Sequence, residues 1–187
     1  LGAEVAGRTL GIVGLGSLGR AIARRAKAFD MMVLATRASA QPGDTDPDVD
    51  ELHPASTLDE LLPRCDAVVA TLPANESTFD MFDASRFGAM AEGAVFVNAS
   101  RGSLAVEPDL VESLRSGHLR AAVLDVTRVE PLPADDPLWD APNLYLSPHT
   151  STSLDRYADN LVDLAADNLN RFVEGQPLRN EVDLAGR

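Results

Sequence analysis

The fold is decided by the stretch Thr9-Leu-Gly-Ile-Val-Gly-Leu-Gly-Ser-Leu-Gly-Arg20. Leu10 to Val13 form a short apolar run typical of a buried strand, and a glycine-rich turn leads from it into a helical pattern. Gly14 permits the tight turn, Gly16 lets a pyrophosphate approach the backbone, and Gly19 lets helix and strand pack closely. The start of the helix offers N–H groups and a positive dipole end to an anion. The stretch predicts a nucleotide site; a plain strand-to-helix turn is the alternative.

Further apolar runs alternate with helical patterns along the rest of the chain. The expected strands are residues 10–13, 31–36, 66–72, 94–98, 121–125 and 144–147, and the later helices are 57–62, 83–90, 107–116 and 154–174. Nearly continuous apolar strands joined by helices indicate a parallel sheet that is covered on both faces. The predicted fold class is therefore α/β, a doubly wound parallel sheet (Rossmann fold) with three layers, α/β/α.

One long connection interrupts this alternation. Residues 37–56 are rich in Asp, Pro and Ser and are expected to form an exposed connection, in which the acidic stretch 44–51 is a solvated loop. Thr57 and Glu60 have the spacing of a capping box, which predicts the start of a short helix, and Pro63 is expected to end that helix.

Composition excludes several classes of function. The net charge of −13 argues against nucleic acid or an anionic membrane as a partner. No apolar run is long enough to span a membrane, and no signal peptide is evident at the N-terminus. The single Cys65 excludes an internal disulfide and is expected to be a packed core thiol in a reducing compartment, the cytoplasm. We expect no metal site.

In a doubly wound sheet, ligands bind beyond the carboxyl ends of the strands. Three chemically distinct side chains follow separate predicted strands: Arg101, Asp125 and His149. Chance can place one polar residue at such a position, but three of different chemistry at one edge indicate a site. His53 and His118 have no such neighbours and are interpreted as surface residues.

At these positions the chain resembles the D-isomer-specific 2-hydroxyacid dehydrogenases. The resemblance covers residues 1 to about 183 and includes the glycine pattern, Val97-Asn-Ala-Ser-Arg-Gly102, Val123-Leu-Asp-Val126, Glu130-Pro-Leu-Pro133, Asp136-Pro-Leu-Trp139, Ser147-Pro-His-Thr150 and Pro177-Leu-Arg-Asn-Glu-Val-Asp183. The run Glu130-Pro-Leu-Pro followed by Pro-Leu-Trp is most similar to the glyoxylate/hydroxypyruvate reductase branch.

The resemblance implies a role for each candidate residue in reducing a small 2-keto acid to a 2-hydroxy acid. His149 would be the acid/base, Glu130 would pair with its imidazole, and Arg101 would bind the substrate carboxylate. Asp125 would orient the nicotinamide. The remaining residues expected to bind the cofactor are Gly14, Gly16, Ser17, Leu18, Gly19, Thr36, Arg37, Leu72, Pro73, Asn98, Ala99 and Ser100.

The end of the second predicted strand bears on the choice between NADP and NAD. Folds that bind NAD usually place Asp or Glu there, about 20 residues after the glycines. This chain has Thr36-Arg37-Ala-Ser39 instead, with no carboxylate to repel a 2′-phosphate and with an arginine to hold one. We therefore predict a preference for NADP over NAD. The alternative is that Arg37 stacks on the adenine and gives no preference.

The resemblance also bears on domain organisation. The sequence begins at Leu1 rather than Met, and residues 1–187 are expected to form a single NAD(P)-binding domain without the substrate-binding domain of the family. Turnover by this domain alone is therefore in question, whereas cofactor binding is expected. The family resemblance further implies a homodimer formed through the cofactor domain.

Other functions remain as alternatives. The first is a non-catalytic, cofactor-sensing module of the same fold, like the corepressor relatives of the family. Formate dehydrogenases also carry Pro-His-Thr-Ser, but they have Gln at the position of Glu130. A Rossmann methyltransferase is disfavoured because its cofactor has no pyrophosphate to require the third glycine.

Overall fold

The computed structural model describes residues 4–151 and 157–181. The chain divides into two units, residues 1–148 and 149–187, which we describe separately; the single domain expected for residues 1–187 stays a prediction. The strands are β1 (Thr9–Val13), β2 (Met32–Arg37), β3 (Glu51–Pro54), β4 (Ala67–Ala70), β5 (Ala94–Asn98), β6 (Leu119–Leu124) and β7 (Leu144–Leu146). The helices are α1 (Ser17–Ala28), α2 (Leu58–Leu61), α3 (Ala84–Ala89), α4 (Glu107–Arg115) and α5 (Tyr157–Val173).

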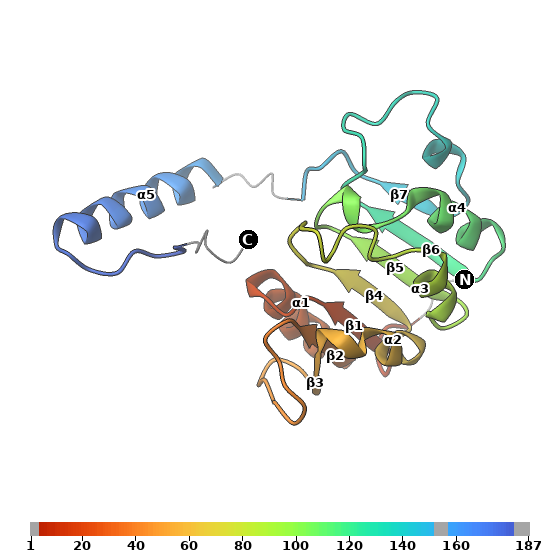
Figure 1. Ribbon diagram of the computed structural model, residues 1–187, viewed down its shortest axis with the longest axis horizontal. Helices are drawn as coiled ribbons and strands as arrows, with labels where there is room; N and C mark the ends of the chain where they lie inside the picture. Colours follow the sequence, from red (N-terminus) through yellow and green to blue (C-terminus); the bar gives the residue numbers. More distant parts are fainter. Residues whose placement is uncertain (1–3, 152–156, 182–187) are drawn as a thin grey trace. The chain divides into compact units, whose positions relative to one another are not determined.

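The first unit is built on one seven-stranded sheet with the strand order β3-β2-β1-β4-β5-β6-β7 (Figure 1). Each neighbouring pair of strands is parallel. The chain moves outward from β1 in one direction to β3, then returns to β4 and continues to β7. The doubly wound α/β fold is confirmed, and its switch point lies between β1 and β4, where the glycine-rich turn begins.

Each face of the sheet has its own apolar core, because successive side chains of a strand point to opposite faces. In β1, Val13 belongs to the core beneath α2, α3 and α4, whereas Ile12 belongs to the core beneath α1. Phe82, Phe87 and Phe96 form the centre of the first core, with ring centroids 4.7 to 6.1 Å apart. The sheet is therefore held rigidly between helices on both faces.

Cys65 is fully buried and packs directly against β1. A Cβ on Gly11 would lie 2.7 Å from its Sγ, which explains the glycine at this position in the strand. Burial raises the pKa of the Cys65 thiol to about 12. The prediction of a packed core thiol is confirmed.

Two predictions for the region around β3 are wrong. The connection 37–56 is not wholly exposed, because it contains edge strand β3, which buries only Leu52. Thr57 makes no capping box: its hydroxyl donates to the carbonyl oxygen of Pro54 at 3.0 Å, within a 3₁₀ turn that precedes α2. A second 3₁₀ turn, Leu62–Arg64, carries the chain past Pro63.

The second unit contains α5, whose first predicted residues, 154–156, lie outside the described part of the chain. None of the described side chains of α5 is buried. In the described ranges 4–151 and 157–181, no helix is both long and apolar enough to cross a membrane.

Candidate functional site

The turn between β1 and α1 has the conformation that the glycine pattern predicts. Gly14 has a φ of 104°, a backbone conformation that residues with a side chain rarely adopt. The N–H groups of Gly14 and Leu15 donate to the carbonyl oxygen of Thr36, at 3.2 and 2.8 Å. The turn is thereby fixed to the carboxyl end of β2, and buried Thr36 contributes through its backbone.

Gly19 and Gly16 lack side chains for different reasons. A Cβ on Gly19 would lie 2.6 Å from the carbonyl oxygen of Gly14, so only glycine allows α1 to lie this close to β1. A Cβ on Gly16 would meet no protein atom within 4 Å. Gly16 gives α1 no capping side chain, and the first turn of α1 has no carboxylate. The N-terminus of α1 therefore opens onto space that suits an anion.

Thr71, which is not among the predicted site residues, supports the same turn from the neighbouring strand. It follows β4, and its hydroxyl donates to the carbonyl oxygen of Gly14 at 2.6 Å. The predicted cofactor residues come next, Leu72 partly exposed and Pro73 exposed. Nothing in the sequence marked Thr71, because the predicted strand 66–72 included it, whereas β4 ends at Ala70.

The turn after β5 uses two predicted cofactor residues to present Arg101. The amide nitrogen of Asn98 donates to the Arg101 carbonyl at 2.9 Å, and its oxygen accepts from the Ser100 N–H at 3.1 Å. The Ser100 hydroxyl donates to the carbonyl oxygen of Ala70 at 2.7 Å. Asn98 and Ser100 are buried and hold the turn, whereas Arg101 is exposed. Cofactor contacts by Asn98, Ala99 and Ser100 stay predictions.

Asp125 lies buried just after β6. Its N–H donates to the carbonyl oxygen of Asn98 at 3.0 Å, and its Oδ1 accepts from the hydroxyl of Ser147 at 2.5 Å. The carboxyl ends of β5, β6 and β7 are thus tied together where the site is predicted. Ser147 was not predicted, and its position two residues before His149 was the only signal for it.

Glu130 lies on the loop that follows β6. Its Oε1 accepts from the N–H of Thr127 at 3.0 Å. Arg128 anchors this loop, because its N–H donates to Oε1 of Glu107 at 2.6 Å and its guanidinium pairs with Asp80. The structure therefore brings Arg101, Asp125 and Glu130 to the ends of neighbouring parallel strands.

His149 begins the second unit, so its predicted pairing with Glu130 stays a prediction. Its φ is 54°, in the left-handed region that residues other than glycine uncommonly adopt. Such conformations gather at functional sites, where surrounding contacts maintain them. The backbone at His149 is consistent with a functional position.

The surroundings of Arg37 correct one premise of the sequence analysis. We expected no carboxylate beside it, but Oδ2 of Asp46 lies 3.4 Å from Nη1 of Arg37, and Oδ2 of Asp44 lies 4.0 Å from Nη2. Both carboxylates come from the connection 37–56. Within the described residues, the buried Nε of Arg37 has no hydrogen-bond partner. Arg37 thus has one donor engaged by a carboxylate and another still available at the end of β2.

Residues 44–50, which we call the acidic strap, are not the solvated loop that their charge suggests. Alternate carboxylates pair with one face of α1: Asp46 with Arg20, Asp48 with Arg24 and Asp50 with Lys27. Within the strap, a turn closed by the hydrogen bond from the Val49 N–H to the carbonyl oxygen of Asp46, at 3.2 Å, lies between these pairs. The strap is therefore held to α1 from Asp46 to Asp50.

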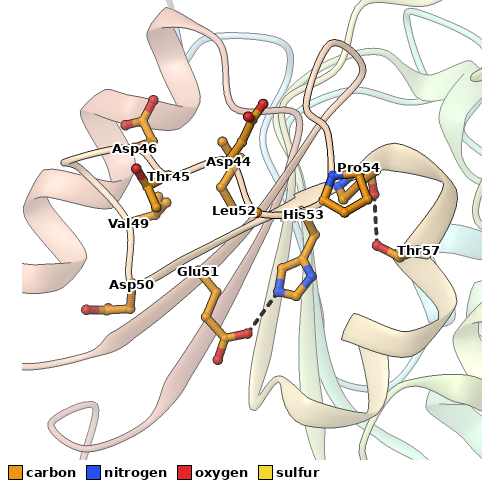
Figure 2. A pocket seen from close by; sticks show the side chains of 12 residues that line it. Asp44, Thr45, Asp46, Val49, Asp50, Glu51, Leu52, His53, Pro54 and Thr57 are labelled. Atoms are coloured by element: carbon orange, nitrogen blue, oxygen red, sulfur yellow. Dashed lines mark hydrogen bonds and ion pairs between the residues drawn. The ribbon is translucent and has the colours of Figure 1, made fainter.

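A cavity of about 490 Å³ is lined by the acidic strap and β3, over residues 42–46, 49–54 and 57. Figure 2 shows two contacts along its wall, His53 with Glu51 and the Thr57 hydroxyl with the Pro54 carbonyl. No lining residue is among the predicted cofactor or catalytic residues. The side chain of His53, which was expected at the surface, is 27% exposed, and its Nε2 lies 2.9 Å from Oε2 of Glu51.

Comparison with known proteins identifies relatives of this chain. The family model described as "D-isomer specific 2-hydroxyacid dehydrogenase, NAD binding domain" matches residues 1–151. Glyoxylate/hydroxypyruvate reductase B of Citrobacter koseri is 37% identical over 97% of this chain and 56% of its own length. Glyoxylate reductase of Korarchaeum cryptofilum is 37% identical over 94% of this chain and 52% of its own length. The chain thus spans about half the length of these curated relatives.

Solved structures agree with these matches. The NADPH-dependent glyoxylate/hydroxypyruvate reductase of Sinorhizobium meliloti, in complex with NADP and sulfate, is 36% identical, with a TM-score of 0.88 over 98% of this chain and 58% of that one. A probable 2-hydroxyacid dehydrogenase of Rhizobium etli, in complex with NADP, is 31% identical, with a TM-score of 0.89 over 100% of this chain and 58% of that one. Motif order, sheet topology and these matches lead to one conclusion: the chain belongs to the NAD-binding domain family of the D-isomer-specific 2-hydroxyacid dehydrogenases.

Proposed function

We propose that this chain binds NADP(H) and carries catalytic residues of a reductase that interconverts small 2-keto and 2-hydroxy acids of the glyoxylate and hydroxypyruvate type. One observation carries the proposal: Arg101 is exposed after β5, at the same edge of the parallel sheet where the open glycine-rich turn follows β1. The printed names of the relatives from C. koseri and S. meliloti support this class of substrate.

The residues at the switch point fit a dinucleotide. Gly16 faces open space at the N-terminus of α1, where a pyrophosphate would bind, and the buried Nε of Arg37 suits a 2′-phosphate. Asp125, at the end of β6, would orient the nicotinamide. When bound, the reduced coenzyme supplies the hydride that converts the keto group to an alcohol.

Three side chains would bind the substrate carboxylate and transfer the proton to or from the substrate oxygen. Arg101 would bind the substrate carboxylate through its planar, two-pronged guanidinium and so align the carbonyl for reaction. His149 would donate a proton to the carbonyl oxygen in reduction and take it back in oxidation. Glu130 would accept the other ring N–H of His149 and fix its orientation, as the carboxylate partners of catalytic histidines do.

Coenzyme binding is tested by titrating the chain with NADPH and with NADH while following nicotinamide fluorescence. NADPH should bind more tightly than NADH. Arg37→Gln should weaken NADPH binding by about tenfold, equivalent to about 1.4 kcal/mol, with little effect on NADH binding. Equal binding of the two coenzymes would contradict the NADP preference. Binding of neither would contradict the coenzyme site itself.

The catalytic part is tested by following NADPH oxidation with glyoxylate or hydroxypyruvate. Arg101→Met should retain NADPH affinity and lower the rate by roughly 100-fold or more, because Arg101 is placed on the substrate and not on the coenzyme. NADPH binding without any turnover by the wild-type chain would fit the cofactor-sensing alternative and equally a domain that turns over only together with the substrate-binding domain of the family.

We further propose that the protein is cytoplasmic and forms a homodimer. The use of a single cysteine, Cys65, is in keeping with a reducing compartment, and the dimer follows from the family resemblance alone. Sedimentation velocity of the purified chain tests the dimer, which a single monomeric species would contradict.

A further inference from the structure

The proposal concerns the carboxylate beside Arg37, and it rests on the coenzyme site proposed above. Asp46 lies 3.4 Å from Nη1 of Arg37 through its Oδ2. The same oxygen is bound by Nη2 of Arg20, from the second turn of α1. The other oxygen, Oδ1, accepts from the N–H of Asp48 at 3.2 Å. One carboxylate thus pairs with two guanidinium groups that come from different elements.

Asp46 is held where it is, independently of Arg37. Its side chain is only 6% exposed, whereas the side chain of Arg37 is 28% exposed. The part of the acidic strap that follows it is tied to α1 by the pair of Asp48 with Arg24 at 2.8 Å and by that of Asp50 with Lys27 at 2.5 Å. Removing Arg37 from this group would therefore leave Asp46 with Arg20 and with its place in the strap.

The Asp46 carboxylate is ionised over the working range of pH. Burial by itself raises the pKa of Asp46, but the hydrogen bonds from Arg20 and the Asp48 N–H, together with the charges of Arg20 and Arg37, lower it further than burial raises it. A fixed negative charge therefore lies beside the one basic side chain at the end of β2 that a 2′-phosphate could reach.

We propose that Asp46 is a specificity-determining residue that weakens the hold of Arg37 on a 2′-phosphate and so sets how strongly this domain prefers NADPH over NADH. A 2′-phosphate on Arg37 lies within a few ångströms of the Asp46 charge, and two anions at that distance repel each other. NADH carries an uncharged 2′-hydroxyl at this position, which the carboxylate does not repel. The acidic strap thus provides from another part of the chain the negative charge that NAD-binding folds place at the end of β2.

The decisive variant is Asp46→Asn, which removes the charge and keeps an oxygen of similar position for Arg20. The probes are 2′,5′-ADP and 5′-AMP, which differ in the 2′-phosphate alone, and their affinities are measured by isothermal titration calorimetry. We expect Asp46→Asn to bind 2′,5′-ADP about tenfold more tightly and 5′-AMP within about threefold of the wild type. The ratio of NADPH to NADH affinity should rise by the same factor.

Asp48→Asn is the matched control, because Asp48 belongs to the same strap and pairs with Arg24 and, at 3.9 Å, with Arg20. It should leave the ratio of 2′,5′-ADP to 5′-AMP affinity unchanged. An equal rise of the ratio in Asp46→Asn and Asp48→Asn would overturn the proposal in favour of general loosening of the strap. Weaker 2′,5′-ADP binding by Asp46→Asn would also overturn it, because Asp46 would then be positioning Arg37 for the phosphate.

Arg37→Gln separates this proposal from the proposed function. If Arg37→Gln abolishes the preference for 2′,5′-ADP and Asp46→Asn does not change it, the coenzyme site stands and the role of Asp46 fails. If the wild-type chain binds neither probe, the coenzyme site itself fails. In Arg37→Gln/Asp46→Asn the gain from Asp46→Asn should disappear, since the contact that it relieves is gone.

Discussion

At the scale of the residue, two glycines at the turn between β1 and α1 lack a side chain for different reasons. Gly19 is required by the protein, since its missing Cβ would lie 2.6 Å from the Gly14 carbonyl oxygen. Gly16 is not required by the protein, because a Cβ there would meet nothing within 4 Å. The pyrophosphate proposed to bind at the N-terminus of α1 would account for a glycine that packing does not require.

This contrast predicts opposite behaviour for two alanine variants. Gly19→Ala should lower the free energy of unfolding by about 1–3 kcal/mol, as overpacking does. Gly16→Ala should cost less than about 1 kcal/mol of stability, but it should weaken NADPH binding by about tenfold, because the new methyl group occupies the approach to the backbone. Thermal unfolding and the fluorescence titration measure the two effects. Unchanged NADPH affinity in Gly16→Ala would place the pyrophosphate elsewhere.

At the scale of the element, Gly102 sets the distance between two loops of the candidate site. It begins the 3₁₀ turn Gly102–Leu104, directly after Arg101, and a Cβ on it would lie 2.1 Å from the carbonyl group of Thr127. The loop at Thr127 leads to Glu130. Two of the proposed catalytic residues are therefore carried by segments in direct backbone contact, and Gly102 permits that contact.

Gly102→Ala should accordingly destabilise the chain by about 3 kcal/mol, the upper part of the range for overpacking, because only backbone atoms can move away. Gly88→Ala is the matched control, since Gly88 lies in α3 and a Cβ there meets nothing within 4 Å. It should raise stability by about 0.5–1 kcal/mol through helix propensity. Urea unfolding followed by circular dichroism compares them, and equal stability of the two variants would contradict the close approach.

The elements that the sequence predicted well are those with a strong local signal. Continuous apolar runs marked the buried strands, and Asp83 was a sound helix start, since its side chain accepts from the N–H of Arg86 at 3.0 Å. Edge strand β3 was missed because only Leu52 is buried in it. The capping box was wrong because the hydroxyl of Thr57 binds a preceding carbonyl, an alternative that the spacing of residues does not show.

The sequence allowed only a part of the candidate site to be predicted, as was the case for the fold. Position after a strand was enough to select Arg101 and Asp125, but it did not separate residues that face a ligand from those that build the turn, such as Ser100. The carboxylate at Arg37 could not be foreseen, because Asp46 reaches it across nine residues of irregular chain and is placed there by Arg20. Ion pairs between separate elements can be identified only from the tertiary structure.

At the scale of the whole molecule, lowering the pH has two opposing effects on the stability of the fold. The net charge of −13 means that protonation of carboxylates relieves self-repulsion and favours the folded state. Particular carboxylates act in the other direction. The hydrogen bond from Lys27, followed by that from the Val33 N–H, holds the pKa of Asp50 below its ordinary value of 3.8. At Asp66, the hydrogen bond from the Thr9 N–H is the main cause that lowers the pKa.

A carboxylate whose pKa is lower in the folded state stabilises that state above its unfolded pKa, and the contribution is lost as pH falls through the folded pKa. We therefore expect the free energy of unfolding to fall as the pH drops below about 4, because the pKa values of both carboxylates lie below 3.8 in the folded state, whereas the general repulsion is screened by salt. Urea unfolding at a series of pH values measures it. Asp50→Asn and Lys27→Met should each flatten the curve, since either change removes the contact that lowers the pKa of Asp50. A wild-type slope in both variants would mean that acid acts on this molecule through net charge rather than through the pairs that hold the acidic strap to α1.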